Sequence, residues 1–481
     1  MIGNVVKWQT ISSVATFSLS LLQVAILARL LNLSDFGLVA IVMVVINISQ
    51  VLSDLGMANY LVHRQKISEA LNSTVFWICF SSGLSLFLLL TVISPFIAEL
   101  YEQSEISYLL SLSAIAFIPI SFSSQMQARY ICDFRLNELA LFDLISKAFG
   151  TIIAVWSAYY GMGAASIILG AVSTHFIKCI LIWGCAEKTW RPKLQFSSAE
   201  AKTAWRYGVY QVGSQLINQF RGNLDTLLLG LYIDKGQLGA YSLAKQLIQK
   251  PASFILPIVQ KVSLPLLASS QSDMEKMRVL VKKAHAYVAA ALTLPYILLC
   301  FLSEEIVIIL YGKDNIDVSL FVIPLALFWA LRSIGGALVG PLSQGLGKTK
   351  IDFYWNLSVL GLYSLVCFML VPYGAYALSW GLLILQAVLI NMVFVVFYKW
   401  VINFNYKWYI TPILMFTALA LISVSISIWL VSSFPFDTQY VLTVVFVSLL
   451  SSCFYYFCSY QFQGNTLMLP NPFSFFKSKQ K

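Results

Sequence analysis

Charged residues are scarce in this chain, and their scarcity limits the class of protein that it can be. Of its 481 residues, 11% are charged and 59% are hydrophobic, whereas a soluble globular domain carries about 25% charged residues. The connections between the apolar stretches are too short to hold a soluble catalytic domain. The composition therefore indicates an integral membrane protein, built almost entirely of membrane-spanning segments.

Residues that commonly bind metals or drive catalysis are also rare. The three histidines, His63, His175 and His285, lie far apart, and the eight cysteines form no Cys-x-x-Cys pair, so the spacing gives no metal site and no disulfide framework. Gly347-Lys348-Thr349 resembles the end of a phosphate-binding loop, but Leu342 stands where the first glycine is needed. The sequence predicts no metal, no cofactor and no enzymatic activity.

Long apolar stretches are what the chain has in abundance. A helix needs about 20 apolar residues to cross a bilayer. Fourteen stretches meet this need: 9–31, 36–58, 73–95, 107–128, 138–159, 163–184, 208–232, 238–260, 285–302, 319–343, 353–371, 375–398, 409–431 and 439–460. The predicted fold class is an all-α integral membrane protein with about 14 transmembrane helices.

The basic residues between these stretches alternate from one side to the other. The connections of one set hold 22 lysines and arginines, and the opposite set holds only Lys235 and Lys313. Because cytoplasmic loops carry the excess of basic residues, both termini are expected in the cytoplasm. Membrane orientation thus accounts for the net charge of +10, and we expect no nucleic-acid partner.

The two halves of the chain resemble each other at nearly constant offsets. Four matches carry the resemblance: Gln125 with Asp133-Phe134 and Asn137 recurs as Gln344 with Asp352-Phe353 and Asn356, Tyr160-Gly161 as Tyr373-Gly374, Leu100-Tyr101 as Leu310-Tyr311, and Gly37 as Gly239. Parallel repeats of this kind place a substrate site between the halves. The predicted domains are an N-terminal lobe at 1–184, a cytoplasmic linker at 185–207, a C-terminal lobe at 208–398, and two extra spans with a tail at 399–481.

Several cations lie inside the apolar stretches, where a charge is costly unless it faces protein or a watery cavity. These residues are Arg29, Lys147, Lys178, Arg221, Lys245, Lys250 and Arg332. Arg29 is close enough to the end of its span for its side chain to reach the membrane interface. The others predict a positively charged cavity, which suits an anionic substrate.

Acidic and amide side chains accompany these cations. Arg221 with Asp225, and Asp143 with Lys147, are four residues apart, so each pair either neutralises itself on one helix face or lines the cavity. At an offset of 202, a polar stripe of the first span falls on one in the seventh. A polar stripe in the membrane faces protein or water, so the candidate cavity-lining residues are Gln23, Gln211, Gln215 and Asn218.

Short motifs in order along the chain resemble one family. They are Ala28-Arg29-Leu30-Leu31 followed by Asp35-Phe36-Gly37, Ser53-Asp54-Leu55-Gly56, and Asn223-Leu224-Asp225 followed by Leu238-Gly239-Ala240-Tyr241. With the duplicated halves, they resemble the polysaccharide-transport (Wzx-type) flippases of the multidrug/oligosaccharidyl-lipid/polysaccharide exporter superfamily. The match is best to the colanic-acid-exporter branch.

The resemblance implies two six-helix lobes in a V-shaped exporter fold, plus two C-terminal helices. It implies a flippase for undecaprenyl-diphosphate-linked oligosaccharide repeat units in the bacterial inner membrane, working by alternating access. The implied partners are this lipid-linked substrate, membrane lipids, H⁺ or Na⁺, and the polysaccharide polymerase machinery. The implied substrate-binding cations are Arg221, Lys245, Lys250 and Arg332, with Lys147 and Lys178, and the implied coupling carboxylates are Asp225 and Asp143.

Other functions remain open from the sequence. A flippase for peptidoglycan lipid precursors would share the spans and the cationic cavity. A multidrug exporter of the same superfamily would more often have an acidic cavity for its cationic substrates. A membrane polymerase or acyltransferase would need a long outward loop with clustered catalytic residues, and the outward loops here are short.

Overall fold

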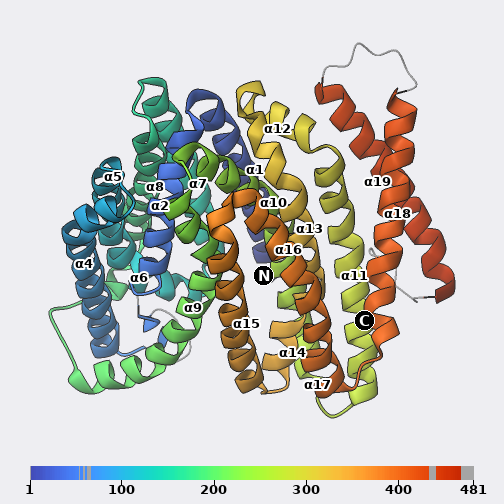
Figure 1. Ribbon diagram of the computed structural model, residues 1–481. Helices are drawn as coiled ribbons and strands as arrows, with labels where there is room; N and C mark the ends of the chain where they lie inside the picture. The colour runs from blue at the N-terminus through green and yellow to red at the C-terminus, as the bar shows by residue number, and fades with distance from the viewer. Residues whose placement is uncertain (1, 54, 58–59, 62–66, 433–439, 467–481) are drawn as a thin grey trace. The chain divides into compact units, whose positions relative to one another are not determined.

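Helices account for all the regular structure that this computed structural model describes (Figure 1). It describes residues 2–53, 55–57, 60–61, 67–432 and 440–466, and within 2–11, 206–211, 214, 349 and 457–466 it describes only the backbone. The helices of the first half are α1 (Ile2–Leu30), α2 (Leu33–Gln50), α4 (Glu69–Leu100), α5 (Glu105–Ala114), α6 (Phe117–Cys132), α7 (Leu136–Tyr159), α8 (Ala164–Cys185), η1 (Lys188–Trp190), α9 (Ser198–Tyr232) and α10 (Lys235–Ala268).

The second half continues in the same way. Its helices are α11 (Met274–Phe301), α12 (Ser303–Tyr311), η2 (Lys313–Val318), α13 (Ser319–Gly336), α14 (Val339–Gly345), α15 (Thr349–Leu370), η3 (Val371–Tyr373), α16 (Gly374–Val393), η4 (Phe394–Lys399), α17 (Trp400–Ile402), α18 (Tyr406–Ser432) and α19 (Tyr440–Thr466). The predicted all-α class is confirmed.

Within the described residues, eleven helical segments are long and apolar enough to cross a membrane, and a shorter apolar helix follows at 440–456. The helices from α15 to α17 follow one another without a gap and count here as one segment of 53 residues. The count also omits α9, whose many polar side chains make it less apolar than the other long helices. The predicted number of fourteen therefore stays a prediction.

One predicted boundary was wrong. The second span was expected to run to residue 58, but α2 ends at Gln50. Leu55 and Gly56 lie just beyond, and both have positive φ angles of 51° and 73°. A right-handed helix cannot continue through such angles, so the helix does not extend through Leu55 and Gly56.

The predicted duplication is visible in the backbone. The residues after α4 and α12, Glu102 and Gly312, both have positive φ angles (53° and 92°). Gly161, ahead of α8, and Gly374, the first residue of α16, also have positive φ angles (78° and 91°). The fourth span of each half is broken, between α5 and α6 in one and between α13 and α14 in the other. Matching turns and breaks at matching places support a repeat of the same fold.

Two compact units emerge from the contacts, Met1–Ser242 and Leu243–Lys481. In the first unit α7 packs against both α1 and α8, and α4 packs against α5 and α6 (Figure 1). The α7–α8 contact is close because a Cβ atom on Gly150 would overlap the Thr174 hydroxyl. Small residues allow such close helix packing in membranes.

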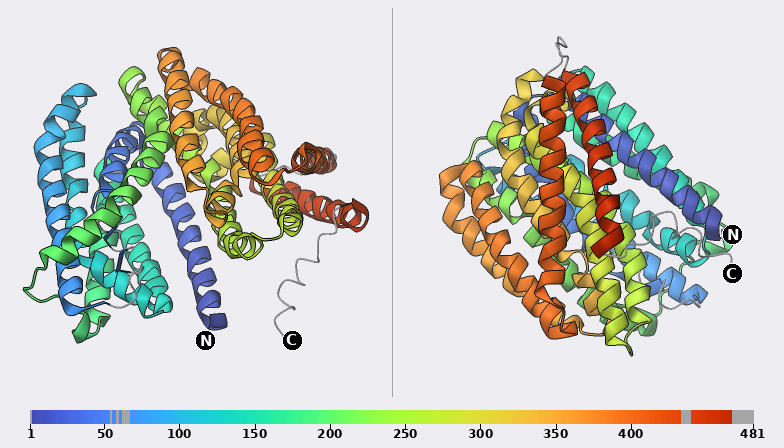
Figure 2. Two further views of the ribbon diagram at one scale, coloured as in Figure 1. Left: turned by 90° about the horizontal axis from the view of Figure 1, so that it is seen from below. Right: turned by 90° about the vertical axis from the view of Figure 1, so that its right-hand side faces the viewer.

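In the second unit α11 packs against α13 and α18, and α18 runs beside α19 (Figure 2). His285 of α11 is fully buried, stacks on Tyr409 with the ring centres 4.7 Å apart, and shares a hydrogen bond of 2.9 Å with the Tyr409 carbonyl oxygen. The buried histidine thus fixes α18 to α11, and the Tyr455 hydroxyl of α19 donates a hydrogen bond of 2.8 Å to the Ala290 carbonyl oxygen of α11. The predicted lobe boundaries stay a prediction.

A symmetric contact joins the start of α2 to the start of α10 inside the first unit. A Cβ atom on Gly37 would overlap the carbonyl oxygen of Lys235, and one on Gly239 would overlap the carbonyl oxygen of Leu33. Both Gly37 and Gly239, and Leu33 and Lys235, are 202 residues apart. Gly37 therefore contacts Lys235, the repeat equivalent of Leu33, and Gly239 contacts Leu33 itself. Such reciprocal contacts are the pattern of a two-fold axis.

Further contacts hold α9 and the start of α10 against the first unit. The Tyr101 hydroxyl donates a hydrogen bond of 3.1 Å to the Leu227 carbonyl oxygen. The Lys235 ammonium lies 3.8 Å from the Glu105 carboxylate. Because of these contacts, the first unit ends at Ser242, within α10, rather than in the linker before α9.

Candidate functional site

The first group of predicted residues lies on α1 and α7 of the first unit. The Lys147 ammonium donates a hydrogen bond of 2.5 Å to the amide oxygen of Gln23, and the Thr151 hydroxyl donates one of 3.2 Å to the same oxygen. Gln23 is 8% exposed. The structure therefore brings Gln23 and Lys147 together, and the buried amide fixes the position of the cation.

A second pair joins α7 to α8. The Lys178 ammonium lies 2.7 Å from the Asp143 carboxylate, and their side chains are 21% and 47% exposed. The spacing in the sequence suggested that Asp143 faces Lys147 on its own helix. The ion pair with Lys178 instead links two helices, and its partial exposure leaves it open to water or a ligand.

Asp225 of α9 is buried, with 1% of its surface exposed. Its carboxylate accepts a hydrogen bond of 2.6 Å from the Tyr241 hydroxyl and one of 3.5 Å from the Thr226 hydroxyl. Tyr241 was not singled out as a site residue, although it ends the motif Leu238-Gly239-Ala240-Tyr241. A phenol so close to a buried acid is the signal that sequence reasoning missed.

The rest of the predicted stripe on α9 lies nearer the start of the helix than Asp225 and is less covered. Gln215 and Asn218 are exposed, and the Asn218 amide oxygen accepts a hydrogen bond of 3.4 Å from the Arg221 guanidinium. The side chain of Gln211 lies outside the described residues. Gln215, Asn218 and Arg221 thus form a polar surface on α9, whereas Asp225 points into the packed end of the unit.

The second unit holds the remaining cations. The Arg332 guanidinium of α13 lies 4.8 Å from the ring centre of Trp329 and 6.0 Å from that of Phe328. Stacking on an aromatic face holds a guanidinium while leaving its edge able to donate hydrogen bonds. Lys245 and Lys250 of α10 are half-buried, and Lys250 precedes the first of three prolines in that helix.

The predicted linker at 185–207 is bound to the first turns of α4. Four hydrogen bonds of 2.9 to 3.1 Å make this attachment: Asn72 to the Trp190 carbonyl, Trp77 to the Lys193 carbonyl, the Lys193 amide to Ser73, and the Ser197 amide to Thr74. Trp190 is itself buried. Polar side chains at the start of an otherwise apolar helix were the only sequence signal for this attachment.

Arg135 completes the attachment of the linker from the other side. Its guanidinium lies 2.6 Å from Glu138 and 3.2 Å from Glu187, and 5.2 Å from the ring centre of Trp190. The hydrogen bond with Glu138 raises the pKa of Arg135 further above its usual value. The linker therefore belongs to the first unit through packing as well as hydrogen bonds. Among the described residues, no group of three acidic, histidine or cysteine side chains could hold a metal ion.

Duplicated apolar helices that carry half-buried cations are typical of an exporter-type membrane protein. The solved structure of the "Lipid II flippase MurJ, inward closed conformation" has the same fold, with a TM-score of 0.75, 15% identity, and coverage of 95% of this chain and 99% of that one. A likeness at this identity concerns the fold alone.

The family follows from the sequence comparisons. The model of the family described as "Polysaccharide biosynthesis protein" matches residues 26–319, and the chain belongs to that family. It is 33% identical to the amylovoran biosynthesis protein AmsL of Erwinia amylovora, over 67% of this chain and 84% of the relative. It is 26% identical to the lipopolysaccharide biosynthesis protein WzxC of Escherichia coli (strain K12), over 84% of this chain and 82% of the relative. These findings confirm the resemblance drawn from the short motifs.

Proposed function

We propose that this chain is a flippase that moves undecaprenyl-diphosphate-linked oligosaccharide repeat units across the bacterial inner membrane. It would supply the assembly of a surface polysaccharide, such as O-antigen, capsule or exopolysaccharide. Family membership and the names of the relatives support the polysaccharide pathway. Of the structural observations, the cations within membrane helices carry the proposal, because a diphosphate needs positive charge in the membrane.

The cations provide the means to bind a diphosphate. The candidate ligands for it are Arg332, held on Trp329, with the half-buried Lys250 and Lys245 in the second unit, and Arg221, Lys147 and Lys178 in the first unit. A charge-assisted hydrogen bond to phosphate is about twice as strong as a neutral one. The prenyl tail would stay in the lipid while the headgroup crosses.

Alternating access would move the headgroup from the cytoplasmic to the outer leaflet. An inside-negative membrane potential acts on each charge with about 2.3 kcal/mol per 100 mV, so it favours the outward movement of an anionic headgroup. H⁺ or Na⁺ exchange at Asp225 or Asp143 would add to this force. Because Asp225 is buried against Tyr241, its ion exchange would require the Tyr241 hydroxyl to move.

The proposal is tested in cells that lack this gene and have no second flippase for the same polymer. We expect the lipid-linked oligosaccharide to accumulate on the cytoplasmic side while surface polysaccharide disappears, and a plasmid copy of the gene to restore both. If pool and polymer are unchanged, the polysaccharide function is wrong. If cells that lack the gene lose viability while their surface polysaccharide stays normal, the result would point instead to transport of a peptidoglycan precursor.

A further inference from the structure

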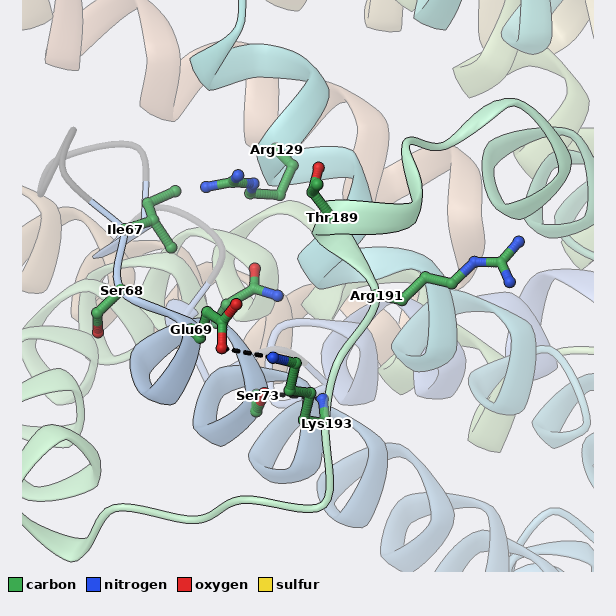
Figure 3. A pocket seen from close by; sticks show the side chains of 9 residues that line it. Ile67, Ser68, Glu69, Ser73, Arg129, Thr189, Arg191 and Lys193 are labelled. Carbon is green, nitrogen blue, oxygen red and sulfur yellow. Dashed lines mark hydrogen bonds and ion pairs between the residues drawn. The ribbon is translucent and has the colours of Figure 1, made fainter.

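A small polar pocket of about 60 Å³ lies in the first unit (Figure 3). The first turn of α4, the last turn of α6 and the linker enclose it. Its lining residues include Arg129, Arg191 and Lys193, but only one acid, Glu69. The positive-inside rule assigns this end of the helices to the cytoplasm. The pocket is therefore a basic site at the membrane surface, separate from the intramembrane cations described above.

The charges of the pocket are not balanced within it. The Lys193 ammonium lies 2.6 Å from the Glu69 carboxylate, so these two neutralise each other. Arg191 extends away from the other lining side chains (Figure 3). The guanidinium of Arg129 is left as the uncompensated charge at the edge of the pocket.

Arg129 also has an unused donor. Its Nε atom is buried and has no hydrogen-bond partner among the described residues. A buried donor without a partner is rare and calls for an explanation. The guanidinium carbon lies 5.7 Å from the ring centre of Trp190, so stacking holds the group in place. It is fixed and charged, and it has capacity to bind an anion.

The remaining walls of the pocket offer hydrogen bonds of the same kind. Thr189 also lines the pocket, and its hydroxyl donates a hydrogen bond of 3.5 Å to the Glu187 carboxylate. Ser68 caps α4 by accepting a hydrogen bond from the Leu71 amide, so the first amides of that helix point toward the pocket end. Helix N-termini favour anions. Arginine and helix amides together form a donor set typical of phosphate binding.

We propose that this pocket binds the phosphate group of an anionic phospholipid from the cytoplasmic leaflet. The apolar segments that border it begin at Glu69 and end at Cys132, which places the pocket at the depth of lipid headgroups. Basic pockets between transmembrane helices on the cytoplasmic side are known places for such headgroups. Because the linker forms one wall and continues into α9, a bound headgroup would hold the linker on α4.

The test uses the purified full-length protein in a neutral detergent and needs no transport measurement. Native mass spectrometry measures the binding of phosphatidylglycerol and phosphatidylcholine, and inorganic phosphate is added as competitor. We expect phosphatidylglycerol to bind about tenfold more tightly than phosphatidylcholine. Both lipids carry the phosphate, but the basic residues of the pocket repel the choline ammonium of phosphatidylcholine. Arg129→Gln should lose that preference, and Arg129→Lys should keep part of it.

Lys188→Gln is the matched control, because Lys188 is an exposed lysine of the same linker and does not line the pocket. It should keep the full preference. Thr189→Val serves as a second pocket variant if Arg129→Gln does not fold. Competition by inorganic phosphate would support phosphate recognition. Binding of phosphate without any preference for phosphatidylglycerol would overturn the lipid assignment. An unchanged preference in folded Arg129→Gln would overturn the site.

Discussion

Alanine in place of Gly37 or Gly239 should destabilise the protein and reduce export of the polysaccharide at least tenfold. In each variant the new Cβ atom would overlap a backbone carbonyl oxygen, that of Lys235 or of Leu33. Backbone cannot swing aside as a side chain does, so the starts of α2 and α10 must separate. Overpacking of this kind costs about 1–3 kcal/mol. Thermal unfolding of the purified protein and the amount of surface polymer in complemented cells measure the two effects.

The symmetry of this contact sharpens the prediction. Because the two glycines occupy equivalent positions in the repeat, the two single variants should show similar losses. Gly184→Ala is the control, since nothing lies within 4 Å of a Cβ atom there, and alanine favours a helix over glycine by up to about 1 kcal/mol. Wild-type stability and export in both Gly37→Ala and Gly239→Ala would show that the close approach is not needed.

The second large effect is expected at Arg332. Arg332→Ala should lower the export rate about ten- to a hundredfold, because a hydrogen bond to a charged group contributes about 1.5–3 kcal/mol. The lipid-linked oligosaccharide should accumulate in proportion. Arg332→Lys keeps the charge but loses the planar group that stacks on Trp329, so it should restore only part of the rate. The measurements are the surface polymer and the lipid-linked pool in complemented cells.

Two comparisons show whether the effect belongs to the binding site. Lys276→Gln removes an exposed cation of α11 that precedes its apolar part, and it should leave export unchanged. Lys250→Ala should resemble Arg332→Ala if both cations bind the diphosphate. Normal export in an Arg332→Ala protein that reaches the membrane in normal amounts would remove Arg332 from the proposed site.

The sequence predicted the features that depend on composition and on order along the chain. Apolar length predicted the helices, and recurring pairs such as Tyr160-Gly161 and Tyr373-Gly374 predicted a repeat whose glycines share positive φ angles of 78° and 91°. Such features are local, because a glycine at a positive φ angle marks its own turn.

The pairing of side chains between helices could not be predicted in the same way. A spacing of four residues shows that Asp143 and Lys147 share a helix face, but it does not show which neighbouring helix meets that face. The structure places Lys178 of α8 beside Asp143 and Gln23 of α1 beside Lys147. Likewise, the bond from Tyr241 to Asp225 depends on how α10 turns back on α9. Tertiary packing decides these contacts.

We propose that this chain itself moves a lipid-linked oligosaccharide across a membrane. The most direct test places the purified protein in liposomes that contain a labelled undecaprenyl-diphosphate oligosaccharide, and follows how fast a sugar-cleaving enzyme that cannot cross the membrane gains access to the headgroup from the opposite leaflet. We expect faster access than in protein-free liposomes, a further increase under a potential that drives anions in that direction, and a slower rate with Arg332→Ala. Access no faster than in protein-free liposomes, with folded wild-type protein present, would contradict it.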